Sequence, residues 1–472
     1  MLGGGGIDRF TVRENALGTV VADGQEGSDL YQLALGTDNN RRIFALDSGT
    51  DVESRDRIVA QLSTSDDNLV LSGESFQVNT DRVGFNMNFE ALFVNAREGN
   101  DTIEVNRMSL DFLRIIGGSG DDVINVNNFT GINQIRVDAG ADNDTIALNA
   151  GTESGIFTGF GGDGDDTFTV TAATFGDATF DGQNGSDTVN VAYTDRADRL
   201  IVAVDSGTFG NDRLNVVGTV LDDPIVLRSG LVELAGQRVI YNERTENLNV
   251  NAEESIDRIS IFGFSAPTTN VFGGDEADLI FVNSTFGPSP NKTLNIDAGR
   301  GNDTVLIRST NDDTRTNVFG REGNDSINFG SSLSDNNGSL DLVRGSVFVD
   351  GNTGDDRIYI NELGKIASYN YNIAPGLVTN GGNGNNTFFG GISYNNVETL
   401  RVDATNFRNQ FNVTASNETQ YNFFGSGGFN TITLNGDASI DGRRFFGVNG
   451  GTGFWNFSNG FRDVFFSNFF IV

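Results

Sequence analysis

Aspartate and glycine residues gather in short turns along this chain, and their chemistry suits metal coordination. The stretch GGDGDDTFTV, residues 161–170, places Asp163, Asp165 and Asp166 beside three glycines, and apolar and polar residues then alternate. Carboxylates and the backbone carbonyls of glycine turns are the oxygen ligands that Ca²⁺ prefers. The same aspartates can instead accept backbone hydrogen bonds and build the turn. Deciding between these roles requires the fold that positions the turns.

The turn recurs along the sequence. Copies of its closing aspartate, Asp166, are mostly 21 to 25 residues apart. Two spacings of 45 residues predict pairs of rungs with a degenerate copy between them, and spacings of 31 and 30 indicate insertions such as residues 331–345. The predicted copies are Asp29, Asp56, Asp101, Asp122, Asp144, Asp187, Asp212, Asp257, Asp278, Asp303, Asp325, Asp356, Asn386, Asn409, Asn430 and Thr452.

Residues around these anchors follow the pattern of a strand with one buried face. The residue two positions after the anchor is apolar in all seventeen copies, and the residue four positions after is apolar in fifteen. Glycine stands two positions before the anchor in twelve copies, as a tight corner requires. One such unit cannot bury its own apolar face, so neighbouring units must stack. The sequence therefore predicts an all-β fold, one parallel β-helix with about 19 rungs of roughly 22 residues, right-handed as most parallel crossovers are.

Two corners resemble a known family. The segments GGSGDDVIN (117–125) and GGDGDDTFT (161–169) match the GGxGxDxUx nonapeptide of the RTX calcium-binding proteins. The resemblance implies a secreted, bacterial-type protein whose corners hold Ca²⁺ between successive turns. The motif returns here once per rung, so only one edge of the solenoid is expected to carry it. The residues expected to bind calcium are Asp101, Asp122, Asp144, Asp166, Asp187, Asp278, Asp303 and Asp325.

The aspartates on successive rungs can also be interpreted without a bound metal. Stacked carboxylates repel one another, which a cation would relieve. The aspartates can also simply form Asx-type turns, with arginine or solvent screening their charge. Arginine directly follows four of the anchors, and from residue 386 onward the anchors become neutral, so an amide ladder is expected in the last rungs. The four arginines are Arg57, Arg213, Arg258 and Arg357.

Composition limits the classes of function. The chain has 64 acidic and 31 basic residues, a formal net charge of −33, no cysteine and no histidine. Such a polyanion is not expected to bind nucleic acid or anionic lipid surfaces. No apolar run is long enough to predict a membrane span. A polysaccharide lyase or glycoside hydrolase is the alternative, because parallel β-helices host such enzymes, but no histidine can serve as a base. Ice binding is disfavoured, since paired threonines occur only at Thr169 and Thr433.

The two ends look uncapped. Residues 1–23 form an N-terminal edge segment, and residues 443–472 form an aromatic segment that contains the single tryptophan, Trp455. The tail is expected either to pair with another subunit or to fold over the last rung as a plug. No N-terminal signal is visible, and the last four residues resemble the C-terminal signal of RTX-type secretion substrates.

The sequence thus predicts a single solenoid domain over residues 1–472, secreted or at the cell surface. We expect it to be a calcium-stabilised structural rod that associates head to tail into filaments or matrix, or one that serves in adhesion with a glycan or surface ligand.

Overall fold

A computed structural model describes most of the chain as stacked strands. The described residues are 1–36, 40–49, 55–108, 110–128, 131–149, 155–171, 177–193, 199–330, 338–364, 368–380, 390–435, 443–444, 451–457 and 461–471. They form two compact units, Met1–Val216 with Gly236–Glu246, and Val217–Ala235 with Asn247–Val472. We call these unit 1 and unit 2. That the chain forms one continuous domain stays a prediction.

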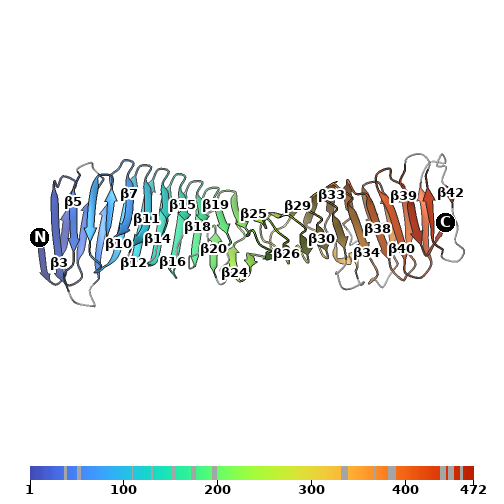
Figure 1. Cartoon of the computed structure of the whole chain (residues 1–472), viewed down its shortest axis with the longest axis horizontal. Coiled ribbons are helices and arrows are strands. Elements are labelled where there is room, and N and C mark those ends of the chain that lie inside the picture. The colour runs from blue at the N-terminus through green and yellow to red at the C-terminus, as the bar shows by residue number, and fades with distance from the viewer. Residues whose placement is uncertain are drawn as a thin grey trace. The chain divides into compact units, whose positions relative to one another are not determined.

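Unit 1 contains two sheets, A and B, whose strands alternate along the chain except at β7–β9 (residues 68–85), which all lie in sheet A (Figure 1). In the order in which they lie side by side, the strands of sheet A are β1 (Leu2–Gly5), β3 (Thr19–Glu26), β5 (Arg42–Leu46), β9 (Asp81–Phe85), β8 (Ser75–Val78), β7 (Asn68–Gly73), β11 (Thr102–Met108), β13 (Val123–Val126), β15 (Thr145–Leu148), β17 (Thr167–Val170) and β19 (Thr188–Ala192). Sheet A also contains β21 (Asp212–Val217). Sheet B consists of β2 (Arg9–Val12), β4 (Leu30–Ala34), β6 (Asp56–Gln61), β10 (Phe89–Glu98), β12 (Leu110–Ser119), β14 (Ile132–Ala141), β16 (Ile156–Asp163), β18 (Ala178–Asn184), β20 (Leu200–Val204) and β24 (Gln237–Tyr241).

Unit 2 repeats this two-sheet construction. Its part of sheet B consists of β23 (Leu231–Leu234), β22 (Pro224–Arg228), β26 (Arg258–Ile261), β28 (Leu279–Val282), β30 (Thr304–Ile307), β32 (Ser326–Phe329), β34 (Arg357–Asn361), β38 (Thr399–Ala404), β40 (Gln420–Gly425), β44 (Val464–Ser467), β43 (Gly453–Asn456) and β42 (Arg443–Arg444). Its part of sheet A consists of β25 (Thr245–Asn251), β27 (Thr268–Asp275), β29 (Lys292–Arg300), β31 (Thr314–Glu322), β33 (Val347–Thr353), β37 (Ile392–Asn395), β36 (Leu377–Asn380), β35 (Asn370–Ala374), β39 (Gln410–Thr414), β41 (Asn430–Asn435) and β45 (Phe469–Ile471). One 3₁₀ turn, η1 (Leu340–Leu342), lies within the predicted insertion at 331–345.

The predicted register of the strands is confirmed. In sheet A of unit 1, Ile103 pairs with Ile124, which pairs with Ile146 on its other side. These side chains are fully buried, and Phe168 and Val189 continue the inward row. The core is thus a set of apolar rows, one residue from each rung. This is the parallel, stacked β-solenoid that the repeat predicts.

The two spacings of 45 residues each hold a degenerate copy of the corner together with an additional antiparallel strand pairing. Each contains a run of three strands, β7–β8–β9 in the first and β22–β23–β24 in the second. Strands β7, β8 and β9 pair antiparallel, as do β22 and β23. The prediction of a degenerate copy in each spacing is confirmed, whereas the antiparallel strands were not predicted. These runs carry their own corner aspartates, Asp67 and Asp223, directly before β7 and β22.

The corner motif also lies on two edges of unit 1 rather than one. Asp29 and Asp56 lie where the chain enters sheet B, whereas Asp101 and the aspartates after it lie where the chain enters sheet A. The change of edge lies between Asp56, where β6 of sheet B begins, and Asp67, directly before β7 of sheet A. The expectation of a single motif-bearing edge is therefore wrong.

The aromatic tail packs against the last rungs of unit 2. Trp455 and Phe466 are buried with ring centroids 5.0 Å apart, and Phe469 meets Phe411 edge to face at 5.0 Å. Strands β44 and β45 extend sheets B and A through β40 and β41. The part of the tail that the structure describes is arranged as the plug alternative requires. Within the described residues, no helix is long and apolar enough to cross a membrane.

Candidate metal centre and the aspartate columns

The corner aspartates form hydrogen-bonded columns. The backbone N–H of each aspartate donates to Oδ1 of the aspartate one rung further on, as from Asp144 to Asp166 at 2.8 Å. In unit 1 the longest column runs through Asp67, Asp101, Asp122, Asp144, Asp166, Asp187 and Asp212 at 2.7 to 2.9 Å. In unit 2 the column runs through Asp223, Asp257, Asp278, Asp303, Asp325 and Asp356 at 2.7 to 2.8 Å. One carboxylate oxygen per rung therefore ties the corner to its neighbour.

The second oxygen of these carboxylates lies against glycine. Oδ2 of Asp166 is buried and accepts no hydrogen bond, and a Cβ added to Gly161 would overlap it. Gly182 and Gly320 have the same relation to Asp187 and Asp325. Glycine at this place, five residues before the anchor, therefore makes room for the carboxylate. Gly161 is the first glycine of the nonapeptide match at 161–169, and the sequence pattern indicated no separate role for it.

Burial raises the pKa values of the column carboxyls. The pKa of Asp101 and Asp166 is raised to about 7 and that of Asp144 to about 8, chiefly by burial, with neighbouring acids adding to the rise and the donated backbone N–H opposing it. In unit 2, burial raises the pKa of Asp303 to about 7. The charged form is penalised because little water reaches these oxygens. Burial thus moves the pKa values of the column carboxyls from the usual acidic range toward neutral pH.

All eight residues predicted to bind calcium lie in these two columns. They occupy successive rungs as expected, but they do not converge, because each rung contributes one corner carboxylate whose Oδ1 already accepts a backbone N–H. Their unpartnered Oδ2 atoms would fit a cation, yet a calcium ion needs six to eight oxygens. The geometry is that of the metal-free alternative, and calcium in these columns stays a prediction.

The columns have distinct ends that sequence reasoning missed. At the last aspartate the acceptor is a glutamate: Asp212 N–H donates to Glu246 Oε2 and Asp356 N–H donates to Glu398 Oε2, both at 2.7 Å. At the first aspartate of the long column, Ser63 donates to Asp67 Oδ2 through both its N–H and its hydroxyl at 2.8 Å. These ends coincide with the antiparallel runs, so they mark where one column stops and another starts.

The expected amide ladder in the last rungs is present. Asn409 Nδ2 donates to Asn430 Oδ1 at 2.7 Å, and Asn430 Nδ2 donates to the Gly427 carbonyl at 3.0 Å. Asparagine thus replaces aspartate without leaving a buried charge. The predicted anchor Asn386 lies outside the described residues.

A different group of aspartates converges in the first rungs of unit 1. Asp29, Asp47 and Asp56 are buried, and each offers one carboxylate oxygen within 4.8 Å of the other two. No other such trio occurs among the residues that the structure describes. Asp47 follows β5 at the place where the adjacent strand β3 has Gly24. An aspartate therefore stands where the neighbouring rung has the glycine that makes room for a carboxylate.

The same substitution occurs a second time in unit 1. Asp205 follows β20 where the adjacent strand β18 has Gly182, and it faces Asp187 and Asp212. These three aspartates line a small cavity of about 20 Å³ together with Val189. Val189 holds the place in its rung that Tyr31 holds in the first cluster, so the smaller side chain leaves the space. The shared peptides ALDSGT (45–50) and AVDSGT (203–208) are the signal that would have revealed the pair.

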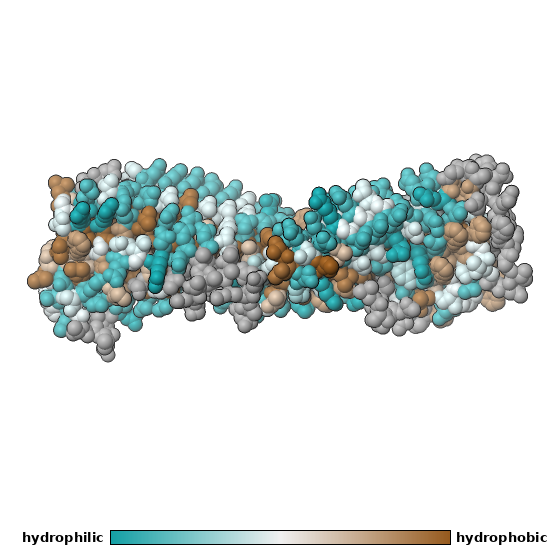
Figure 2. All heavy atoms as spheres, in the orientation of Figure 1, coloured by the Kyte–Doolittle hydropathy of each residue, from teal (hydrophilic) through white to brown (hydrophobic). Residues whose placement is uncertain are grey.

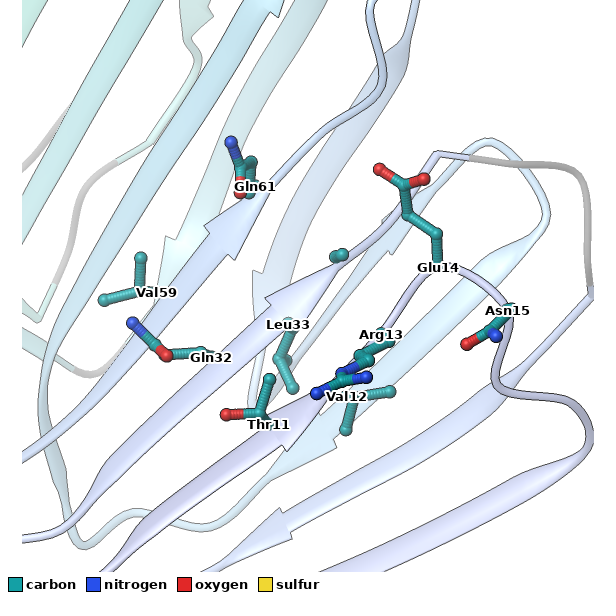
Figure 3. Close-up of a pocket in the computed structure, with 10 residues that line it drawn as sticks. Thr11, Val12, Arg13, Glu14, Asn15, Gln32, Leu33, Val59 and Gln61 are labelled. Carbon is teal, nitrogen blue, oxygen red and sulfur yellow. The ribbon is translucent and has the colours of Figure 1, made fainter.

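A larger pocket lies beside the first strands of sheet B (Figure 3). Its volume is about 560 Å³, and its floor includes Thr11, Gln32 and Val59 from β2, β4 and β6. Residues 13–15 form one wall. The buried guanidinium of Arg41 holds this wall by donating to the Arg13 carbonyl at 3.1 Å while it pairs with Asp81. The pocket is therefore preformed and rich in groups that can hydrogen-bond a polar ligand.

Comparison with known proteins does not assign the chain to a family. No protein-family model matches it, and no curated protein matches its sequence.

Proposed function

We propose that this protein is a structural solenoid of the cell surface or extracellular space that associates with further copies of itself. The main observation behind the proposal is how the aspartates at the corners are bonded. Their carboxylates are buried and accept hydrogen bonds from the backbone of the preceding rung, which supports a role in holding rungs together rather than in turnover. Depolymerisation of a polysaccharide by the purified protein would favour the enzyme alternative instead.

Association is supported by the first strand of sheet A. Among the described strands, β1 pairs only with β3, so its other side offers unpaired backbone groups. Leu2 and Ile7 beside this edge are 73% and 83% exposed, and Figure 2 shows apolar surface at the N-terminal end. Exposed apolar residues at an open strand edge favour pairing with another chain. A head-to-tail contact does not close, so filaments are the expected product.

The test is sedimentation velocity and electron microscopy of the intact chain and of a Leu2→Lys/Ile7→Lys variant. The intact chain should form concentration-dependent assemblies, and the variant should remain monomeric because lysine at an edge opposes pairing. A Met87→Lys/Ile156→Lys variant adds the same charge at exposed positions elsewhere in unit 1 and should assemble normally. A monomeric intact chain at high concentration would refute association.

Adhesion is the second candidate, and the preformed polar pocket favours it. Binding of a soluble oligosaccharide that Gln32→Ala abolishes would establish this role, whereas binding that survives the change would place the ligand elsewhere.

A further inference from the structure

We propose that Asp29, Asp47 and Asp56 bind one calcium ion. This site differs from the aspartate columns because three carboxylates converge at one corner. It does not depend on self-association, since all three residues lie within unit 1.

The backbone fixes how these carboxylates point. Asp29 N–H donates to Asp56 Oδ1 at 2.6 Å, Asp8 N–H donates to Asp29 Oδ1 at 2.8 Å, and Gly49 N–H donates to Asp47 Oδ1 at 3.0 Å. Each carboxylate is therefore held by one of its oxygens. Asp56 is fully buried, and its Oδ2 accepts no hydrogen bond. A buried carboxylate oxygen without a partner is costly, and a cation at the centre of the trio would supply one.

The donor set selects the class of cation. All three ligands are carboxylate oxygens, which suit hard cations rather than those that prefer nitrogen or sulfur. Oxygens bound to one Ca²⁺ at about 2.3 to 2.6 Å lie within roughly 5 Å of one another, as these three do. Among the ion pairs between described residues, none is formed by Asp47 or Asp56. The trio therefore has the charge and spacing for a divalent ion.

Two further groups face the site. Glu90 accepts the Asp56 N–H, which places another acid beside the trio. The Tyr31 hydroxyl donates to the Leu46 carbonyl, next to Asp47. Neither group carries a positive charge that would offset the carboxylates of the trio, and a bound cation would supply one.

The recurrence of this arrangement indicates that it is a built feature. Asp205 replaces the column glycine in the second cluster just as Asp47 does in the first, and Gly207 N–H donates to Asp205 Oδ1 at 2.8 Å as Gly49 does to Asp47. In the second cluster the aspartates surround a cavity large enough for one small group. The first cluster, with closer oxygens, is the tighter of the two, so we assign the calcium ion to it.

The test is isothermal titration of the full-length, chelator-treated protein with CaCl₂ at pH 8, with thermal melting in parallel. The intact protein should show a saturable calcium step and a melting temperature that rises with calcium, because the ion binds the folded state. Asp47→Gly restores the glycine of ordinary rungs, so the variant should fold, and it should bind calcium at least tenfold more weakly. Its melting temperature in chelator should equal or exceed that of the intact protein.

Two control variants test whether the loss of calcium binding is specific to Asp47. Asp142→Gly removes one exposed acid at a residue with φ of 79° and should retain the tightest calcium step, as should Asp205→Gly. Loss of this step in either control but not in Asp47→Gly would overturn the site. So would the absence of any calcium response up to about 10 mM, above the range of weak extracellular calcium modules. Equal binding of MgCl₂ at the same concentrations would overturn the assignment to calcium.

Discussion

The corners at Gly161 and Asp47 occupy equivalent places in their rungs but hold opposite chemistry. At Gly161 the absent side chain makes room for Asp166, whose carboxylate accepts a hydrogen bond from the backbone of the preceding rung and belongs to no converging trio of described residues. At Asp47 a third carboxylate enters the same space and meets Asp29 and Asp56. The choice of glycine or aspartate at this one place therefore distinguishes a corner whose carboxylate is held by the backbone from a corner where three carboxylates meet and a counter-ion is needed. The lesson is that acid frequency alone does not identify a metal site in a repeat protein; convergence does.

The largest effect is expected when a carboxylate is buried away from any corner. Ile124→Asp places an acid in the apolar row of sheet A, where its neighbours Ile103 and Ile146 offer no N–H. We expect a loss of about 3 to 5 kcal/mol in the free energy of unfolding, measured by urea denaturation, because an unpaired charge is buried. The adjacent, outward-facing Asn125→Ser should change it by less than about 0.5 kcal/mol. Equal losses at the two positions would contradict the register.

An intermediate effect is expected at the glycine itself. Gly161→Ala adds a Cβ that overlaps Asp166 Oδ2, so the carboxylate must move and its bond from Asp144 N–H weakens. Overpacking of this kind costs about 1 to 3 kcal/mol, which urea denaturation can measure. Gly5→Ala is the matched control, because nothing lies within 4 Å of the added atom. A neutral Gly161→Ala would show that the corner does not require glycine.

A smaller effect, the pH dependence of the melting temperature, should show whether the column carboxyls are protonated or bind calcium. Unfolded aspartate has a pKa near 3.9, and the folded columns raise it to about 6 to 8 by burial. The native state therefore binds more protons than the unfolded state between these values, so stability falls as pH rises from about 4 to 8. In chelator, the melting temperature should be higher at pH 5 than at pH 8.

Asp166→Asn sharpens this pH experiment. The amide keeps an acceptor for Asp144 N–H, as Asn430 does for Asn409, but it cannot ionise. The variant should gain stability relative to the intact protein at pH 8 and lose that advantage at pH 5. A melting temperature that rises from pH 5 to pH 8 in chelator would contradict burial of these carboxyls in the native state.

The fold could be predicted because apolar residues and corner aspartates recur at regular spacings in the sequence. Ile124 and Val189 could be placed inward from the alternation alone, and the equal spacing of Asp101, Asp122 and Asp144 placed them in one column. Asp67 escaped notice because Ser65 stands where most copies have glycine, so it lacks the corner signature. Antiparallel pairing of β7 with β8 depends on contacts between strands that no local period encodes.

The converging site was harder to predict for a geometric reason. Asp47 precedes its anchor, Asp56, by nine residues, whereas Asp205 precedes its anchor, Asp212, by seven. The spacings differ because loops of unequal length intervene. Alignment on anchors therefore does not bring them into one position. Only strand register shows that each takes the place of a glycine. The predicted metal residues followed the periodic acids, whereas the candidate site lies where the period is broken.

Anomalous diffraction from crystals of the full-length protein grown with calcium tests this account most directly. A calcium peak among Asp29, Asp47 and Asp56, with none between successive rungs from Asp101 to Asp187, is the predicted result. Peaks repeated along the Asp101 to Asp187 column with none at the Asp47 corner would contradict it.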